Sequence, residues 1–124
     1  MMTALIMILL GSAHAWSDQP IVVEINIGSR HSVFVLSADG EKSELEFRNS
    51  NGEKIKRKLA AAEIKAVDQK VRELPKDSHD LKLCPESHFR FLSRHGVREV
   101  CEGSQTPLGL KSRVIVQALL GAIK

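Results

Sequence analysis

The apolar residues of this chain follow two different spacings, and the spacing changes near Ala60. Before that point they alternate with polar residues, which predicts strands with one buried face. The alternating runs are IVVEINI (21–27), SVFVLS (32–37), SELEFR (43–48) and EKIKRKL (53–59). Turn-forming residues separate them, including Asp39-Gly40, a strong hairpin motif. We therefore expect an antiparallel meander.

From Ala60 onward apolar residues return every three or four positions, which predicts a helix with one apolar stripe. The stripe consists of Ala60, Ile64, Val67, Val71 and Leu74. Pro75 should end this helix at about Leu74. The charged residues of the segment, including Asp68, are expected to cover the solvent side.

The tail, TPLGLKSRVIVQALLGAIK (106–124), predicts a second helix with Thr106 as N-cap and Pro107 in the first turn. Gly109 weakens that start, so the helix could instead begin near Leu110. The β-branched run RVIV (113–116) leaves a strand as the alternative. The expected fold class is α+β: an antiparallel meander and a C-terminal hairpin, with two helices packed on the sheet.

The first fifteen residues, MMTALIMILLGSAHA, combine a short apolar run with the small-x-small triplet Ala13-His14-Ala15. This pattern is typical of a cleavable signal peptide, although its usual positive charge is missing. We expect cleavage after Ala15, leaving one small domain from Trp16 to Lys124 with no transmembrane span. The predicted location is secreted or periplasmic.

Both cysteines lie in CPESHFRFLSRHGVREVC (84–101), together with His88 and His95. The order of these residues suggests either a four-ligand metal site or a disulfide. Export favours a disulfide between Cys84 and Cys101, and the spacing lacks the close ligand pairs of a zinc site. We therefore expect one disulfide and no metal.

Two strand-like runs, HFRFLS and VREVC, predict a hairpin within this stretch. The preferred loop is Arg94-His95-Gly96, which places Phe89 opposite Cys101 and Phe91 opposite Glu99. A two-residue loop of His95-Gly96 is the alternative, and it exchanges the faces of one strand. In both cases Phe89 and Phe91 are the expected core residues.

Motifs for catalysis are absent from the sequence: it has no nucleophile elbow, no zinc-protease helix and no phosphate-binding loop. We expect no enzyme activity and no cofactor; a small hydrolase using His88 or His95 is the weaker hypothesis. The formal net charge of +3 is small for a nucleic-acid-binding protein, so no nucleic-acid partner is expected.

The densest charge cluster is Lys54-Ile55-Lys56-Arg57-Lys58. In a strand, Lys54, Lys56 and Lys58 share one face, which could meet an anionic polymer or an acidic protein patch. The favoured interpretation is that they are the solvated lysines of an edge strand, which prevent sheet-to-sheet association. The candidate partner-binding residues are these three lysines together with Arg94 and His95 at the hairpin tip.

The order of elements, together with RKLAAAEIKAVDQKVRELP (57–75), resembles the emfourin family of small bacterial proteins. The founding member of that family inhibits a thermolysin-like metalloprotease. The resemblance spans roughly residues 20–123 and implies an inhibitor-like α+β fold. Because GSRHSVF (28–34) stands where we expect the family's Gly-rich first hairpin, no inhibitory residues are assigned.

The predicted function is that of an exported, non-catalytic binding protein. It would inhibit or modulate an unidentified secreted or periplasmic protein, such as a protease. The alternative is a cell-envelope protein that binds an anionic polymer through the lysine-rich strand.

Overall fold

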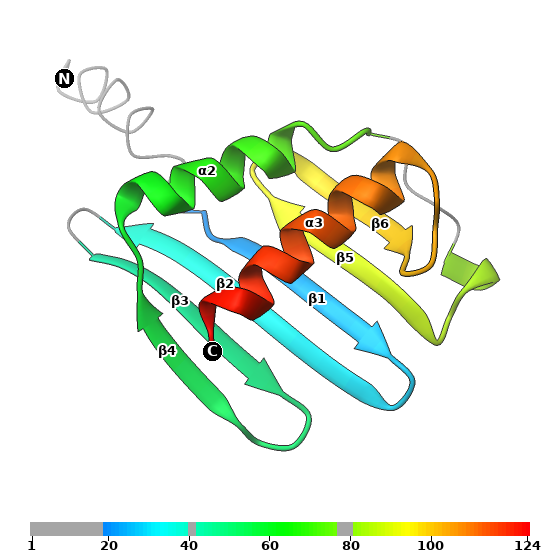
Figure 1. Cartoon of the computed structure of the whole chain (residues 1–124), viewed down its shortest axis with the longest axis horizontal. Coiled ribbons are helices and arrows are strands. Elements are labelled where there is room, and N and C mark those ends of the chain that lie inside the picture. Colours follow the sequence, from blue (N-terminus) through cyan, green and yellow to red (C-terminus); the bar gives the residue numbers. More distant parts are fainter. Residues whose placement is uncertain (1–18, 40–41, 77–80) are drawn as a thin grey trace, which may run out of the picture.

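The computed structural model describes residues 19–39, 42–76 and 81–124, and within them six strands form one antiparallel sheet (Figure 1). The strands are β1 (Ile21–Ile27), β2 (Arg30–Asp39), β3 (Lys42–Asn49), β4 (Lys54–Lys58), β5 (Ser87–Ser93) and β6 (Gly96–Cys101). The helices are α2 (Ala61–Arg72) and α3 (Pro107–Ala122), and a short 3₁₀ turn, η1, covers Leu81–Leu83. The predicted signal peptide, residues 1–15, lies outside the described residues.

The strand order β4-β3-β2-β1-β5-β6 confirms the expected meander and C-terminal hairpin. The hairpin does not continue from β4, because β5 pairs with β1 at the other side of the meander. Helix α2 carries the chain across the sheet between these two positions (Figure 1). Central strand β1 therefore has partners from both halves of the chain.

Both helices lie on the same face of the sheet (Figure 1), which makes the protein a two-layer α+β structure. The core forms between these layers from the alternate strand residues that the sequence pattern predicts. Its least exposed apolar side chains are Val23, Phe34, Leu45, Phe91 and Val100. Helix α2 contributes Ile64 and Val71 from its predicted stripe, and α3 contributes Ile115 and Leu119.

Helix α3 begins where the sequence predicts, and RVIV (113–116) is helical rather than extended. The Thr106 hydroxyl accepts a hydrogen bond of 3.2 Å from the backbone N–H of Gly109, which caps the first turn. A Cβ atom on Gly109 would lie only 2.3 Å from the carbonyl oxygen of Ser104. Gly109 therefore permits the close approach of the preceding loop, and this explains a helix-weakening residue at that position.

The register of the β5–β6 hairpin differs from both predicted arrangements. The loop is Arg94-His95, and Phe89 lies opposite Val100 while Phe91 lies opposite Arg98. The preferred prediction would have turned the Glu99 carboxylate toward the core, where an unpaired charge is costly. In the observed register Val100 and Arg98 turn inward instead, and Glu99 pairs with Arg90 on the opposite face. The buried Arg98 guanidinium donates to the carbonyl oxygens of His95 and Val97.

The predicted disulfide joins Cys84 and Cys101, whose Cα atoms are 5.7 Å apart. The metal-site alternative for these two thiols is thereby excluded. Among residues 19–39, 42–76 and 81–124, no three His, Cys, Asp or Glu residues form a group that could hold a metal ion. Neither described helix is long and apolar enough to cross a bilayer.

Candidate functional site

The face of the sheet opposite the helices, which we call the open face, carries the outward side chains of all six strands. Strand pairing aligns these residues in rows that run across the sheet. They include most of the polar residues that sequence analysis placed on strands.

One row forms an apolar strip that we define by Val35, Val22, Leu92 and Val97. The four residues are successive neighbours, because Val22 pairs with both Val35 and Leu92, and Leu92 pairs with Val97. The first three are partly buried by their neighbours, and Val97 is 45% exposed. Val33 lies beside the strip on β2. No described helix covers this face of the sheet. A protein that packs on the apolar strip would therefore exclude water from it.

A charged row runs next to the apolar strip across β1, β5 and β6. Arg90 lies between Glu24 and Glu99, with N–O distances of 4.0 Å to Glu24 and 3.3 Å to Glu99. These side chains are only partly exposed, so their positions are restricted by the neighbouring strands. The row offers both charges in fixed order, which favours a partner with a matching pattern over one of uniform charge.

A third row links two histidines through an asparagine. His31 Nδ1 donates to Asn26 Oδ1, and Asn26 Nδ2 donates to His88 Nε2 over 3.2 Å. His88 in turn lies opposite Cys101, so the disulfide closes this row at the β6 edge. The period-2 pattern predicts which face these residues occupy. It does not predict that they meet, because the contacts depend on the pairing of three strands.

The lysine row lies on edge strand β4, and Lys54, Lys56 and Lys58 are exposed on the open face. Neighbouring strand β3 places Arg48, Glu46 and Glu44 opposite them. Lys56 lies 3.9 Å from a Glu46 carboxylate oxygen, and Arg48 also pairs with Glu46. Two glutamates therefore reduce the positive charge that this row presents to a partner.

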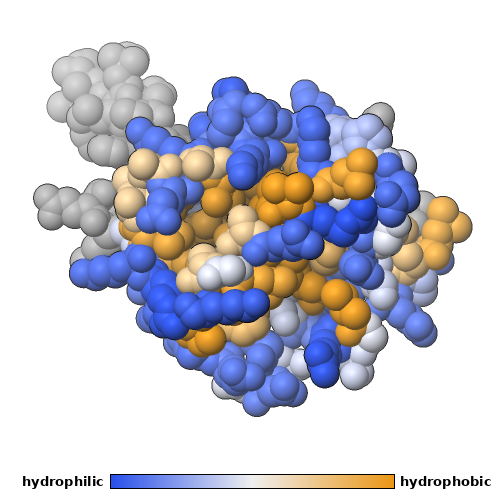
Figure 2. Space-filling model, viewed as in Figure 1, coloured by the Kyte–Doolittle hydropathy of each residue, from blue (hydrophilic) through white to orange (hydrophobic). Residues whose placement is uncertain are grey.

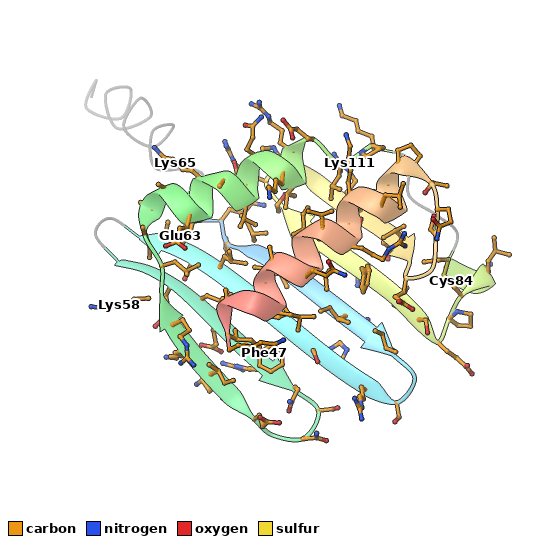
Figure 3. The ribbon with its side chains drawn as sticks, in the orientation of Figure 1. Phe47, Lys58, Glu63, Lys65, Cys84 and Lys111 are labelled. Carbon is orange, nitrogen blue, oxygen red and sulfur yellow. A yellow bond between two sulfur atoms is a disulfide. The ribbon has the colours of Figure 1, made fainter. Side chains whose placement is uncertain are left out.

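The other two predicted partner-binding residues, Arg94 and His95, do not join the lysine row. Figure 1 shows the β5–β6 hairpin at the opposite side of the sheet from β4, and Figure 3 shows Lys58 and Cys84 at opposite ends of the molecule. At the hairpin tip Arg94 and His95 contact Asp68 of α2. The five predicted residues are thus divided between two distant regions.

Asp68 was expected on the solvent side of α2, and that prediction is wrong. It is 8% exposed and accepts two hydrogen bonds from the hairpin tip. One comes from an Arg94 guanidinium nitrogen at 2.9 Å and the other from His95 Nε2 at 3.0 Å. Burial alone would raise the pKa of the Asp68 carboxyl. The hydrogen bond from Arg94 and the nearby His95 outweigh burial, so the pKa lies below its ordinary value.

The Asp68–His95 pair has the first two members of a hydrolytic triad, but its geometry is that of a structural clamp. Among the residues that the structure describes, the His95 ring hydrogen-bonds to Asp68 and to no hydroxyl or thiol. Ser93 is close, yet its hydroxyl accepts from the backbone N–H of His95 at 3.1 Å. Buried Arg98 donates to the carbonyl oxygen of His95 and fixes the loop from the other side. The cluster therefore fastens the hairpin to α2.

No protein-family model, curated protein or solved structure matches this chain. The resemblance to emfourins therefore still rests on the order of elements and the 57–75 segment.

Proposed function

We propose that this protein is an exported, non-catalytic binding protein that inhibits or modulates a secreted or periplasmic protein, such as a protease. The observation that carries the proposal is the open face, where the apolar strip borders the charged row of Glu24, Arg90 and Glu99. Proteins recognise one another through surfaces that combine an apolar centre with a polar rim. The disulfide is consistent with export, because disulfides persist mainly in oxidising compartments.

The open face has the dimensions of a protein interface. Six strands spaced about 4.8 Å apart, each of about seven residues, give a surface of roughly 24 by 24 Å. With side-chain relief this approaches the roughly 800 Å² that each partner buries in a standard-size complex. The apolar strip would form the centre of the interface, from which water is excluded. Arg90 with its two glutamates would set orientation.

Protein binding fits the open face better than polymer binding does. An anionic polymer needs cations that are free to neutralise it, and its affinity comes mainly from charge. Here Glu44 and Glu46 lie opposite the lysines, and the apolar strip has no role in contacting a charged polymer. The exposure of Lys54, Lys56 and Lys58 along one edge still supports the polymer as a second candidate.

Affinity capture from the exported proteins of the producing organism tests the proposal. The bait is the wild-type protein, compared with Leu92→Arg on the open face and with Val114→Arg on the helical face as a matched control. Val114 is 54% exposed, so its substitution should not affect folding. We expect a stoichiometric, salt-tolerant complex that Leu92→Arg abolishes and Val114→Arg preserves. Inhibition of a captured protease should follow the same pattern.

Binding to an anionic polymer gives the opposite result. Retention on the polymer would fade steeply with salt and disappear in Lys54→Ala/Lys56→Ala/Lys58→Ala, while Leu92→Arg would have little effect. If the protein binds the polymer in this way and no protein partner is lost on Leu92→Arg, polymer binding replaces protein binding as the proposed function.

A further inference from the structure

The helical side of the molecule contains an apolar groove that the proposed protein-binding face does not use. Figure 2 shows apolar residues gathered over α3 and between the two helices, with hydrophilic residues around them. A hollow of about 240 Å³ opens between α2 and α3, and a second of about 180 Å³ adjoins it. Lys70 and Ile115 line both hollows, so the two form one continuous groove.

The groove exists because short side chains face one another across the gap between the helices. Ala66 on α2 and Ala118 and Ala122 on α3 all line it. Both helices rest on the sheet, so the alanines leave space that larger side chains would fill. Apolar Val67 and Leu119 complete its walls. A cavity of about 150 Å³ already holds benzene, and the larger hollow alone exceeds that volume.

The groove has a direction, because its two ends differ in charge. Lys70, in the last turn of α2, and Lys111, in the second turn of α3, line the same hollow at one end together with Glu73. The Glu73 carboxylate accepts a hydrogen bond of 3.0 Å from Gln69. Glu63 lines the groove toward the other end, where its carboxylate accepts from the backbone N–H of Ala60 (Figure 3). The Lys70–Lys111 end therefore favours an anion.

The excess of basic residues in the helical layer also favours an anionic ligand. The basic residues of this layer are Lys65, Lys70, Arg72, Lys111 and Arg113, and its acidic residues are Glu63, Asp68 and Glu73, the C-cap of α2. Asp68 already forms an ion pair with Arg94 and a hydrogen bond with His95. A ligand that is apolar over most of its length and anionic at one end thus matches both the walls and the charge.

We propose that the groove binds a single-chain anionic amphiphile, with its chain between Val67 and Leu119 and its headgroup beside Lys70 and Lys111. From Lys111 to Ala122 the groove follows α3 for about 17 Å, since an α-helix rises about 1.5 Å per residue. That length accommodates an extended chain of about a dozen carbons. The site lies on the face opposite the apolar strip, so occupation of one does not block the other.

Titration of the isotope-labelled protein with dodecanoate, below the concentration at which it forms micelles, tests the proposal by NMR. Saturable binding of one dodecanoate per protein should shift the amide signals of α2 and α3 along the groove. Ala118→Trp fills the groove and should abolish these shifts. The matched control is Ala62→Trp, because Ala62 is exposed on α2 and does not line the groove. It should bind as the wild type does.

The headgroup end is tested separately. Lys70→Glu/Lys111→Glu should weaken dodecanoate binding about tenfold, as expected for the loss of two exposed charge pairs. Lys65→Glu, which changes a lysine outside the groove, should leave it unchanged. Dodecyltrimethylammonium carries the same chain with a cation and should bind the wild type at least about tenfold more weakly.

Three results would overturn the proposal. The first is the absence of saturable binding by dodecanoate. The second is equal binding of the anionic and cationic amphiphiles that Ala118→Trp does not affect, which would indicate unspecific adsorption. The third is a concentration-dependent dimer that Ala118→Trp disrupts, since a second copy of the chain would then occupy the groove.

Discussion

The two edges of the sheet are held in different ways. At the β6 edge the hairpin is fastened twice: the Cys84–Cys101 disulfide holds its base, and Asp68 of α2 holds its tip through Arg94 and His95. At the β4 edge the strand is held mainly by backbone pairing with β3. Ile55 is its one inward apolar side chain, and it is only partly buried.

This difference indicates that stability is concentrated at the edge formed by the C-terminal hairpin. The β4 edge has few buried contacts, so it should open more readily in local fluctuations. Its lysines protect an accessible edge from pairing with another chain, as edge-strand lysines commonly do. Substitutions at each edge test whether the two edges differ in stability. We expect the loss in the free energy of unfolding to be largest for the disulfide and smallest for the lysines.

Removing the disulfide should have the largest effect. The cysteines are separated by 17 positions. In the chain-entropy model, closing a loop of this size contributes about 3 kcal/mol. Cys84→Ala/Cys101→Ala should lower the free energy of unfolding by about this amount in urea denaturation. Reductant should destabilise the wild type similarly and leave the double variant unchanged. A loss below about 1 kcal/mol would show that the base of the hairpin does not depend on the bond.

Asp68→Asn should have the next largest effect, because it removes a buried negative charge that accepts two hydrogen bonds. We expect a loss of about 2 kcal/mol in the free energy of unfolding. Glu73→Gln is the control on the same helix, since Glu73 is exposed and should change stability by less than about 0.5 kcal/mol. Equal losses in the two variants would contradict the assignment of Asp68 as the clamp of the hairpin tip.

The stabilisation from Asp68 should also depend on pH. Its pKa in the folded protein lies below its ordinary value, so between the folded and unfolded pKa values the unfolded chain binds more protons. This contribution to stability is present above the unfolded value of about 3.9 and is lost as the pH falls through the folded pKa. The difference in unfolding free energy between the wild type and Asp68→Asn should therefore shrink from about pH 5 to about pH 2. A difference in unfolding free energy that stays constant over this pH range would contradict a stabilising role for the Asp68 carboxylate.

Ile55→Ala should have a smaller effect at the β4 edge. Ile55 is partly buried against the core, so its truncation should cost about 1 kcal/mol, well below the range for fully buried isoleucines. Hydrogen exchange provides a second measurement, because β4 amides should exchange faster than those of β5 in the wild type. Slower amide exchange in β4 than in β5 would contradict the inference that the β4 edge opens more readily.

The lysines should contribute least to stability. Lys54→Ala/Lys56→Ala/Lys58→Ala removes exposed side chains, of which Lys56 makes one long ion pair with Glu46. The free energy of unfolding should change by no more than about 0.5 kcal/mol. The protein should nevertheless self-associate more readily in light scattering, since an unprotected edge can pair with another copy. A large loss of stability without association would contradict a protective role.

Much of the fold was determined by the sequence alone. Alternation in IVVEINI and its neighbours, the apolar stripe from Ile64 to Leu74, and the Thr106-Pro107 start were each sufficient to locate an element. These patterns are local, since a period of two or of 3.6 fixes which side chains share a face. The even cysteine count, together with the predicted signal peptide, was sufficient to predict the disulfide.

Only the tertiary structure decided how those faces meet. The burial of Asp68 could not be predicted from the sequence, because a charged residue at one helical position looks like any other solvent-side residue until its partners are known. The hairpin register could not be predicted either, since Gly96 is compatible with several loops and the choice depends on whether Glu99 or Val100 turns inward. The open-face rows and the groove between the helices likewise depend on pairing between distant segments. A local period determines the direction of a side chain, whereas its neighbours are determined by packing.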